Sequence, residues 1–210
     1  MTVLDIHTHH PAPQPLGVIS AAPEELPVLS GAQLYSAGIH PWNVKGIGLS
    51  AAQTAALTAA ASRSDVVAIG ETGIDLVREG CAPLAGQINA MRAHIDLSES
   101  LGKPLILHCV RGHDIIAQTR RELNPTQPWI IHGFRGKPSI ADILLKAGCV
   151  LSFGDRFNAE ALLCVPPEAI LAETDEAEYD IREVIGLLAE CRPEIDEALI
   201  SANSARVLGL

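Results

Sequence analysis

Residues 3–9 read Val-Leu-Asp-Ile-His-Thr-His, a largely apolar run that ends in two histidines. Side chains alternate between the two faces of a β-strand, so Asp5, His7 and His9 are expected to share one face. Two imidazoles spaced in this way are able to hold one metal ion. Asp5 would then contact these metal-bound imidazoles without binding the metal itself. A polar strand end at the protein surface is the competing interpretation of this short motif.

Four further segments repeat the pattern of an apolar run that ends in a metal-binding residue type. They are residues 66–71, 104–108, 129–132 and 170–175, and they end in Glu71, His108, His132 and Asp175. A polar side chain at the end of a buried strand costs free energy unless it is paired or bound to a cation. Taken singly, the two histidines have an ordinary interpretation as core residues, and the two carboxylates as helix-capping or loop residues.

Together these segments predict the fold. Short aliphatic runs alternate along the chain with longer helical patterns, as expected for βα units and a parallel sheet. The expected strands are 3–8, 16–20, 33–39, 66–70, 104–108, 129–133, 149–153 and 169–174, and the expected helices are 50–63, 84–101, 112–123, 137–147, 157–164, 177–191 and 194–208. A closed barrel would gather the strand ends, and with them the metal-binding residues, into one ring. We therefore predict a TIM-type (β/α)8 barrel made by a single domain, residues 1–210.

The first two connections of this barrel are unusually short. Residues 10–15 contain three prolines and leave no room for a helix, and residues 21–31 have room for one helical turn at most. Parallel neighbours normally need a dozen or more connecting residues. Either the barrel is distorted, with abbreviated early βα connections, or one early segment is not a strand.

Composition narrows the class of protein. Of the 210 residues 48% are hydrophobic and only 3% aromatic, which predicts a packed aliphatic core. The net charge of −10 argues against broad electrostatic capture of nucleic acid, although bound divalent cations would reverse the local field. Five widely spaced cysteines favour a reducing compartment over a disulfide framework. Neither a signal peptide nor a membrane span is apparent, so we predict a cytoplasmic protein without a membrane partner.

The same segments resemble the TatD family of metal-dependent deoxyribonucleases, one of the amidohydrolase-like barrels. The matching stretches run in the family's order along the whole chain: residues 5–9 (D-x-H-x-H), 38–41 (G-[IV]-H-P), 70–75 (G-E-I-G-L-D), 107–109 (I-H-x), 132–134 (H-x-F), 173–175 (E-T-D) and 203–208 (N-x-x-R-[LV]-[FL]). Ligand types that mix imidazole and carboxylate without thiolate suit Zn²⁺, Mn²⁺, Fe²⁺ or Mg²⁺.

The resemblance implies two divalent metal ions (Zn, Mg or Mn) and hydrolysis of phosphodiester bonds, typically as a 3′→5′ exonuclease on DNA. It implies one ion at His7, His9 and Asp175, the other at His108 and His132, and Glu71 as the bridge between them. Asp175 would also accept a proton from the attacking water, so Asp175 and Glu71 are the expected catalytic residues. In the wider superfamily a lysine commonly stands between the metals, and no expected strand here ends in lysine.

Several neighbouring residues have less specific expectations. His40, Arg111 and Arg135 would contact the substrate phosphate, whereas Lys137 is more simply a solvated loop charge. Asp75 would order the loop or a ligand. Glu173 is expected to point away from the site if Asp175 lies in it.

The chain departs from the family pattern in its loops and keeps the ligands. It is short for the family, the segment 176–177 reads Glu-Ala in place of a common Ser-Pro, and the arginine that usually follows the histidine at 108 is delayed to Arg111. We therefore expect DNA or another phosphodiester as the partner of the site. Two alternatives stay open: a related metallohydrolase of a small phosphoester, lactone or amide, and a metal-binding barrel that serves as an interaction module.

Overall fold

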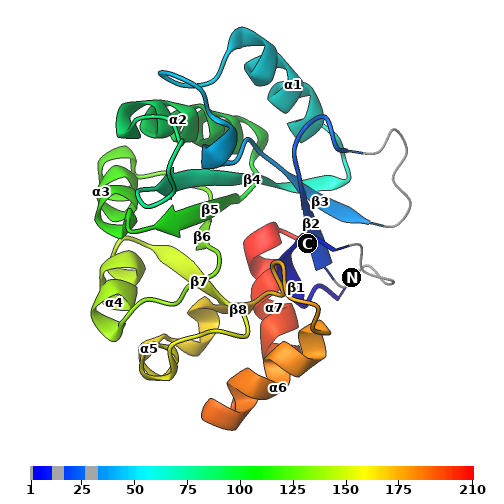
Figure 1. Cartoon of the computed structure of the whole chain (residues 1–210). Helices are drawn as coiled ribbons and strands as arrows, with labels where there is room; N and C mark the ends of the chain where they lie inside the picture. The colour runs from blue at the N-terminus through cyan, green and yellow to red at the C-terminus, as the bar shows by residue number, and fades with distance from the viewer. Residues whose placement is uncertain (1, 11–16, 27–32) are drawn as a thin grey trace.

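The computed structural model describes residues 2–10, 17–26 and 33–210, and in it eight parallel strands close into a barrel (Figure 1). The strands follow chain order around the ring: β1 (Asp5–Thr8), β2 (Gly17–Ala21), β3 (Leu34–Ala37), β4 (Val66–Asp75), β5 (Leu105–Val110), β6 (Trp129–Ile131), β7 (Cys149–Phe153) and β8 (Ile170–Ala172). β1 pairs with both β2 and β8, which closes the ring. The predicted TIM-type (β/α)8 barrel is confirmed.

Helices cover the outside of the barrel from β3 onward (Figure 1). In chain order they are α1 (Ala51–Ala61), α2 (Leu84–Leu101), α3 (His113–Leu123), α4 (Pro138–Lys146), α5 (Ala159–Cys164), α6 (Ile181–Cys191) and α7 (Glu197–Leu208), with short 3₁₀ turns η1 (Pro41–Asn43) and η2 (Pro167–Ala169). All seven lie where the sequence pattern predicts them, because apolar residues recur along each at helical spacing.

Local caps explain where two of these helices begin and end. The Ser50 hydroxyl accepts a hydrogen bond from the Gln53 backbone, and the Gln53 side chain accepts one from the Ser50 backbone, which makes a capping box at the start of α1. α2 ends at Gly102, whose φ of 65° is left-handed. Glycine adopts this conformation without the steric cost of a Cβ atom.

The short early connections produce a distorted barrel that keeps all its strands. β2 pairs in parallel with β1 and β3, so it is a true strand. In the second connection residues 22–26 form a turn with no helix. The remainder of both short connections, residues 11–16 and 27–32, lies outside the described residues. The distortion appears in β1, where Asp5 pairs with Gly17 and Thr8 with Ile19, so one extra residue is accommodated as in a β-bulge.

The interior of the barrel changes from apolar to polar along the strands. Towards the strand beginnings it is filled by one aliphatic cluster that draws on seven strands and α7, with Ile6, Val18, Leu34, Ala68, Ile106, Ile130, Leu171 and Val207 among its members. Two residues after Ile106 and Ile130, on the same face, come His108 and His132. The polar layer therefore lies at the C-terminal ends of the strands, where barrel enzymes place their active sites.

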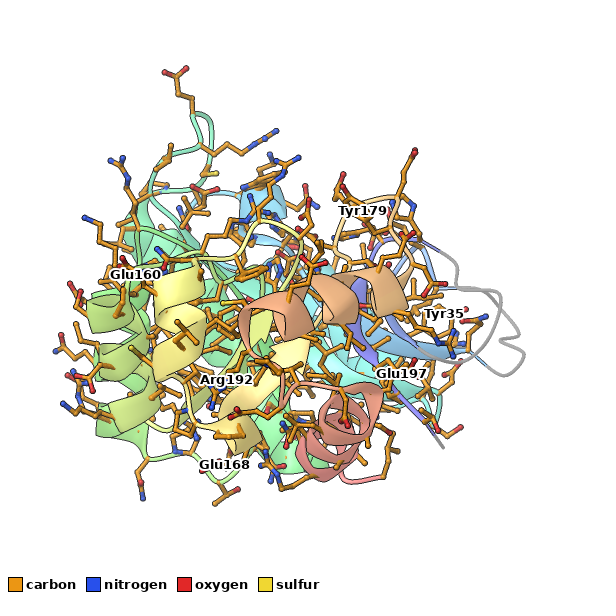
Figure 2. All side chains as sticks on the ribbon, turned by 90° about the horizontal axis from the view of Figure 1, so that it is seen from below. Tyr35, Glu160, Glu168, Tyr179, Arg192 and Glu197 are labelled. Atoms are coloured by element: carbon orange, nitrogen blue, oxygen red, sulfur yellow. The ribbon has the colours of Figure 1, made fainter. Side chains whose placement is uncertain are left out.

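A larger aliphatic cluster lies between the strands and the helices, as the composition predicts. On the side of α5, Arg192, labelled in Figure 2, fastens the end of α6 by donating hydrogen bonds to the backbone carbonyls of Leu162 (3.0 Å) and Val165. The cysteines are all free. Cys109 packs against this outer cluster, and burial raises the pKa of its thiol to about 12. Among the described helices there is none with the length and apolarity required to cross a bilayer.

Candidate metal centre

Glu71, on β4, lies at the centre of a group of histidines, and its side chain is only 6% exposed. Its Oε1 atom lies 2.7 Å from His132 Nε2, 2.8 Å from His108 Nδ1 and 3.0 Å from His40 Nε2. These three histidines come from the ends of β6, β5 and β3. One carboxylate oxygen is thus surrounded by three imidazoles.

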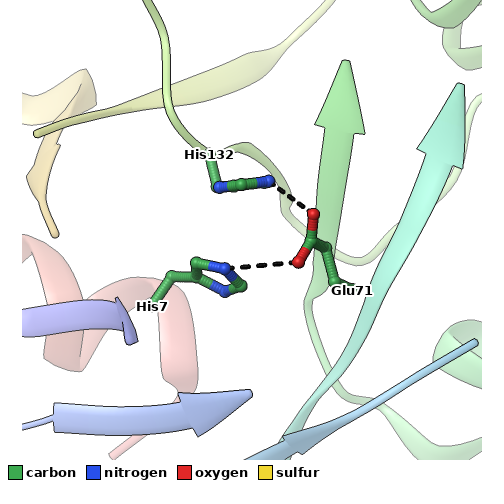
Figure 3. A group of neighbouring side chains, drawn as sticks. All are labelled: His7, Glu71 and His132. Atoms are coloured by element: carbon green, nitrogen blue, oxygen red, sulfur yellow. Dashed lines mark hydrogen bonds and ion pairs between the residues drawn. The ribbon is translucent and has the colours of Figure 1, made fainter. Parts of the chain in front are cut away.

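The second oxygen of Glu71 faces a different pair of histidines. Oε2 lies 3.4 Å from His7 Nε2 and 3.6 Å from His9 Nε2. Figure 3 shows His7 and His132 approaching the two oxygens from separate strands. A carboxylate with each oxygen directed at its own set of nitrogen donors is the arrangement expected of a ligand that bridges two cations.

Asp175 completes the group around His7 and His9. Its Oδ1 atom lies 3.7 Å from Nε2 of each histidine. The segment that follows β8 is fastened to β1 by two backbone hydrogen bonds, from His9 N to Asp175 O and from Asp175 N to His7 O, both 3.0 Å. Asp175 has a φ of 54°, in the left-handed region that non-glycine residues rarely occupy and that is enriched at functional sites.

The donor atoms fit divalent cations. Four groups of ligand atoms lie within 4.8 Å of one another: His7-Glu71-His132, His7-His9-Asp175, His40-Glu71-His108 and His132-Glu173-Asp175. Both ring nitrogens of His7 are buried without a hydrogen-bond partner. Such unsatisfied buried atoms are uncommon and require an explanation. A cation held by imidazole nitrogens and carboxylate oxygens supplies one for nitrogens that face this centre.

Electrostatics of the site favour positive charge. Burial alone would raise the pKa of Glu71, but the charge of His132 and hydrogen bonds from His108 and His132 hold that pKa well below its usual range. Burial alone would lower the pKa of His132, but Glu71 and Glu173 raise it well above its usual range. The nearby carboxylate of Glu71 likewise raises the pKa of His9. The carboxylates thus attract protons onto neighbouring imidazoles, and a metal ion would displace those protons.

His40 lies inside the ligand group, closer to the centre than its expected role at the substrate phosphate would require. Its Nε2 atom is 3.3 Å from His108 Nδ1 as well as 3.0 Å from Glu71 Oε1. Its Nδ1 atom accepts a hydrogen bond from the Trp42 backbone at 3.2 Å, so η1 fixes the ring. Burial lowers the pKa of His40, which favours the neutral imidazole that a metal needs.

Two carboxylates lie behind the ligand histidines. Asp75 Oδ2 is 3.3 Å from His108 Nε2 and accepts a hydrogen bond from Trp42 Nε1 at 2.8 Å. Glu173 Oε1 is 3.5 Å from His132 Nδ1 and accepts a hydrogen bond from Gly133 N at 2.5 Å. Carboxylates in this position fix the orientation of a histidine and decide which nitrogen faces the metal. Asp75 also orders the loop after β4, since its Oδ1 atom accepts hydrogen bonds from Val77 N (2.9 Å) and Arg78 N (3.0 Å), and it lies where it would orient the candidate ligand His108.

Two expectations about side-chain direction are wrong. Glu173 does not point away from the site, since its side chain is fully buried beside His132. β8 ends at Ala172, so strand alternation no longer separates it from Asp175. Asp5 does not stand behind the imidazole rings, because the bulge in β1 interrupts the alternation there. Its carboxylate instead accepts hydrogen bonds from the Thr174 hydroxyl (2.6 Å) and backbone (3.1 Å), which anchors the segment that carries Asp175.

Two cavities open onto this centre. The first, of about 350 Å³, is lined by ligand residues together with Trp42, Asn43, Glu25 and Glu176. The second, of about 390 Å³, adjoins His108 and His132 and is lined by Arg111 and Arg135. Both arginines are exposed, in agreement with a contact to substrate. Lys137 is exposed at the start of α4, as expected for a solvated charge.

Sequence reasoning did not identify Trp42 or the inward orientation of Glu173, and it placed His40 only at the phosphate. The Gly-Ile-His-Pro segment at 38–41 was the available signal for His40, since it also follows an apolar run. Glu173 lies within the strand-end segment 170–175, but the direction of its side chain depends on a backbone turn that no local pattern reveals.

A parallel barrel that gathers imidazoles and carboxylates around a buried glutamate at its C-terminal end defines the class of metal-dependent hydrolases. Residues 28–182 match the family model described as TatD related DNase, and the chain belongs to this family.

Named relatives and a solved structure match this chain over two thirds of its length or more. The uncharacterized metal-dependent hydrolase TatD of Mycobacterium tuberculosis is 29% identical over 206 residues, which cover 85% of this chain and 77% of that protein. The 3′-5′ ssDNA/RNA exonuclease TatD of Erwinia billingiae is 32% identical over 67% of this chain, and the match spans only 56% of its own length. The crystal structure of YjjV, a TatD homologue from Escherichia coli, superposes with a TM-score of 0.79 at 19% identity and covers 99% of this chain and 98% of that chain, which supports the fold.

Proposed function

We propose that this protein is a metal-dependent nuclease that hydrolyses phosphodiester bonds of single-stranded DNA or RNA from the 3′ end. The observation that carries the proposal is Glu71, whose two oxygens face separate sets of histidines. The name of the Erwinia billingiae relative supports the substrate and the direction of attack. The cysteine usage supports a cytoplasmic location.

Two divalent cations, Zn²⁺, Mg²⁺ or Mn²⁺, would occupy the two sides of Glu71. His7, His9 and Asp175 would hold one. His108 and His132, which both approach Oε1 of Glu71, would hold the other, with His40 beside it. When bound, such ions polarise a phosphodiester and acidify a water molecule. The neighbouring histidines hold the pKa of Glu71 well below its usual range, so its carboxylate is already in the ionised form that a ligand to both ions would need.

The chain's own residues would position the substrate and move the proton. Asp175 lines the cavity with a side chain that is 26% exposed, so its carboxylate is accessible to a water molecule and can accept a proton from it. Arg111 and Arg135 line the neighbouring cavity, where their guanidinium groups would bind phosphate in the bidentate manner typical of arginine.

The proposal is tested by metal content together with turnover. We expect the purified protein, loaded with Mn²⁺, Mg²⁺ or Zn²⁺, to bind two ions per chain and to shorten a 5′-labelled single-stranded oligonucleotide. Glu71→Ala should lower kcat/KM by about 10³-fold or more and reduce the bound metal, because both sides of the centre lose a ligand. Glu160→Ala, an exposed carboxylate on α5, is the matched control and should retain both.

Each outcome decides between the candidates. Absence of bound metal after reconstitution would contradict every catalytic version of the proposal and leave the interaction module. Turnover of a small phosphodiester, lactone or amide with no cleavage of DNA or RNA would assign the centre to a related metallohydrolase. Full activity in Glu71→Ala would show that this residue is not the bridge.

A further inference from the structure

The metal centre lies between two cavities of opposite charge. Apart from the candidate ligands, the first cavity has two charged residues in its lining, Glu25 and Glu176, and neither lysine nor arginine is among the described residues that form it. The second cavity is lined by Arg111 and Arg135, and its one acidic residue is Asp175. Segments 11–16 and 27–32 contain no charged side chain, so they do not alter this division.

The two cavities meet at the site of the reaction. His108, His132 and Asp175 belong to the lining of both. A chain-like substrate whose scissile phosphate rests at the centre must therefore extend to one side over arginines and to the other over glutamates. The parts of the substrate on the two sides of the scissile phosphate would therefore lie in surroundings of opposite charge.

The acidic side keeps its charge when the metals are counted. Two divalent ions would be partly neutralised by Glu71 and Asp175, whereas Glu25 and Glu176 lie outside the ligand group. Within the described chain neither of these two glutamates takes part in an ion pair, although Glu176 also lines a small third cavity, of about 120 Å³, whose lining includes Arg135 and Arg156. Glu25 is fixed near the cavity, because its Oε2 atom accepts a hydrogen bond from Ala22 N at 3.0 Å. Arg78 lies 3.7 Å from the centroid of the Trp42 ring, outside the cavity lining.

Resting on the proposed nuclease function, we infer that this division selects the chemical end of the substrate: the terminal unit enters the acidic cavity with a free hydroxyl, and a terminal phosphate is rejected. A terminal phosphate carries a charge of about −1.5 to −2 at pH 7 and would face two carboxylates. A hydroxyl can donate a hydrogen bond to a carboxylate instead. The phosphates of the remaining polymer follow the arginine side, and Trp42, 40% exposed, offers an aromatic surface to the terminal base.

The test compares two oligonucleotides that differ in one group. A 5′-labelled single strand ending in a 3′-hydroxyl is compared with the same strand ending in a 3′-phosphate, using metal-loaded protein. We expect kcat/KM for the first cleavage to favour the hydroxyl end by about 10-fold or more, because juxtaposed like charges oppose binding. The preference should weaken at high salt, since the carboxylates are exposed to solvent.

Variants that remove charges test which residues cause the preference for the hydroxyl end. The double variant Glu25→Gln with Glu176→Gln should remove most of the preference, and each single variant part of it. Arg111→Gln with Arg135→Gln should raise KM for both substrates and keep the preference. Glu168→Gln, an exposed carboxylate on η2 that is labelled in Figure 2, should change neither. Fluorescence anisotropy of both strands with protein in EDTA gives a second readout, independent of turnover, in which the hydroxyl end should bind more tightly.

The outcomes separate this inference from the proposed function. Cleavage of neither strand under any metal would contradict the nuclease proposal itself. Equal cleavage and equal binding of the two strands, or a preference for the phosphate end, would overturn the charge-based selection and leave the nuclease intact. A preference that survives the double glutamate variant unchanged would likewise overturn it.

Discussion

The first three strands and the last five belong to the same barrel, but they differ in the segments that connect them. β1, β2 and β3 are joined by residues 9–16 and 22–33, whereas each strand from β4 to β7 is followed by a helix on the outside of the barrel. Burial of the strands themselves does not follow this difference: the last three residues of both β2 and β5 are only partly buried, whereas every residue of β1, β3 and β6 is buried. Even so, the poorly covered part supplies His7, His9 and His40 to the metal centre. Ligand placement therefore depends on strand pairing, and helix coverage serves stability.

The largest effect is expected from removing core volume in the well-covered part. Ile116, on α3, is fully buried in the outer cluster, whereas Ile19, on β2, is only partly buried. Ile116→Ala should lower the free energy of unfolding by about 2–5 kcal/mol, and Ile19→Ala by about 1 kcal/mol, because a cavity costs most where the surroundings cannot relax. Denaturant unfolding of both variants measures this, and equal losses would break the comparison.

A buried histidine connects the two parts and makes stability depend on pH. His94, on α2, accepts a hydrogen bond from Ile39 N, just after β3, at 2.9 Å, and its Nδ1 atom lies 2.8 Å from Ala90 O. Burial lowers its pKa from 6.5 to about 4. The unfolded chain takes up a proton below pH 6.5 and the native state does not, so the contribution of His94 is complete above pH 6.5 and is lost as pH falls towards 4.

The loss amounts to roughly 3 kcal/mol over that window. His94→Gln keeps an acceptor for Ile39 N and removes the titration, so its stability should fall less steeply between pH 6.5 and 4. Unfolding of both proteins in EDTA, where the metal ligands titrate alike, isolates the difference. Parallel pH profiles would show that His94 does not govern this window.

A smaller effect is expected for the carboxylate behind His132, in the well-covered part. Glu173→Gln keeps the shape of the side chain and removes its charge, which weakens the orientation of the His132 ring. Metal affinity should fall by about 10–100-fold, as is typical when such a supporting carboxylate is lost. Asp142→Asn, an exposed carboxylate paired with Lys146 on α4, is the control. A competition titration with a chelator measures both variants, and unchanged affinity in Glu173→Gln would assign that residue to structure alone.

The smallest effect is expected at the border between the two parts, where α1 begins. Ser50→Ala removes the side-chain half of the capping box and should cost about 1 kcal/mol. Ser62→Ala, exposed at the other end of α1, should stay within about 0.5 kcal/mol of the parent protein. Metal affinity should be unchanged in both, because α1 carries no ligand; a change there would show that helix coverage reaches the centre after all.

The strands and part of the centre could be predicted from the sequence because three of the candidate ligands are each the first polar residue after an apolar run. This local signal holds for Glu71, His108 and His132 whatever the rest of the chain does. Two paired strands extend further than expected, since β4 continues to Asp75 and β5 to Val110, and they stay paired up to those residues. The glycine-rich end of β4 has the sequence of a loop. Only its pairing with β5 shows that it is part of the strand.

The remaining features depend on contacts between distant segments. His40 reaches Glu71 through η1, Glu173 turns inward after β8 ends, and Asp5 binds Thr174 across the closure of the ring. No periodicity encodes these directions, because turns and a bulge interrupt the alternation on which side-chain predictions rest. The division of charge between the two cavities likewise depends on side chains that only the folded barrel brings together.

The two backbone hydrogen bonds between Asp175 and β1 also bear on biosynthesis. They join the first strand to the segment after the last one, so the candidate metal ligands at residues 7 and 9 lie beside the one at residue 175. On the ribosome these donors are separated until nearly the whole barrel has emerged. A site that needs all three donors could therefore form only after the segment that follows β8 has been synthesised, and a chain terminated before Asp175 would lack it.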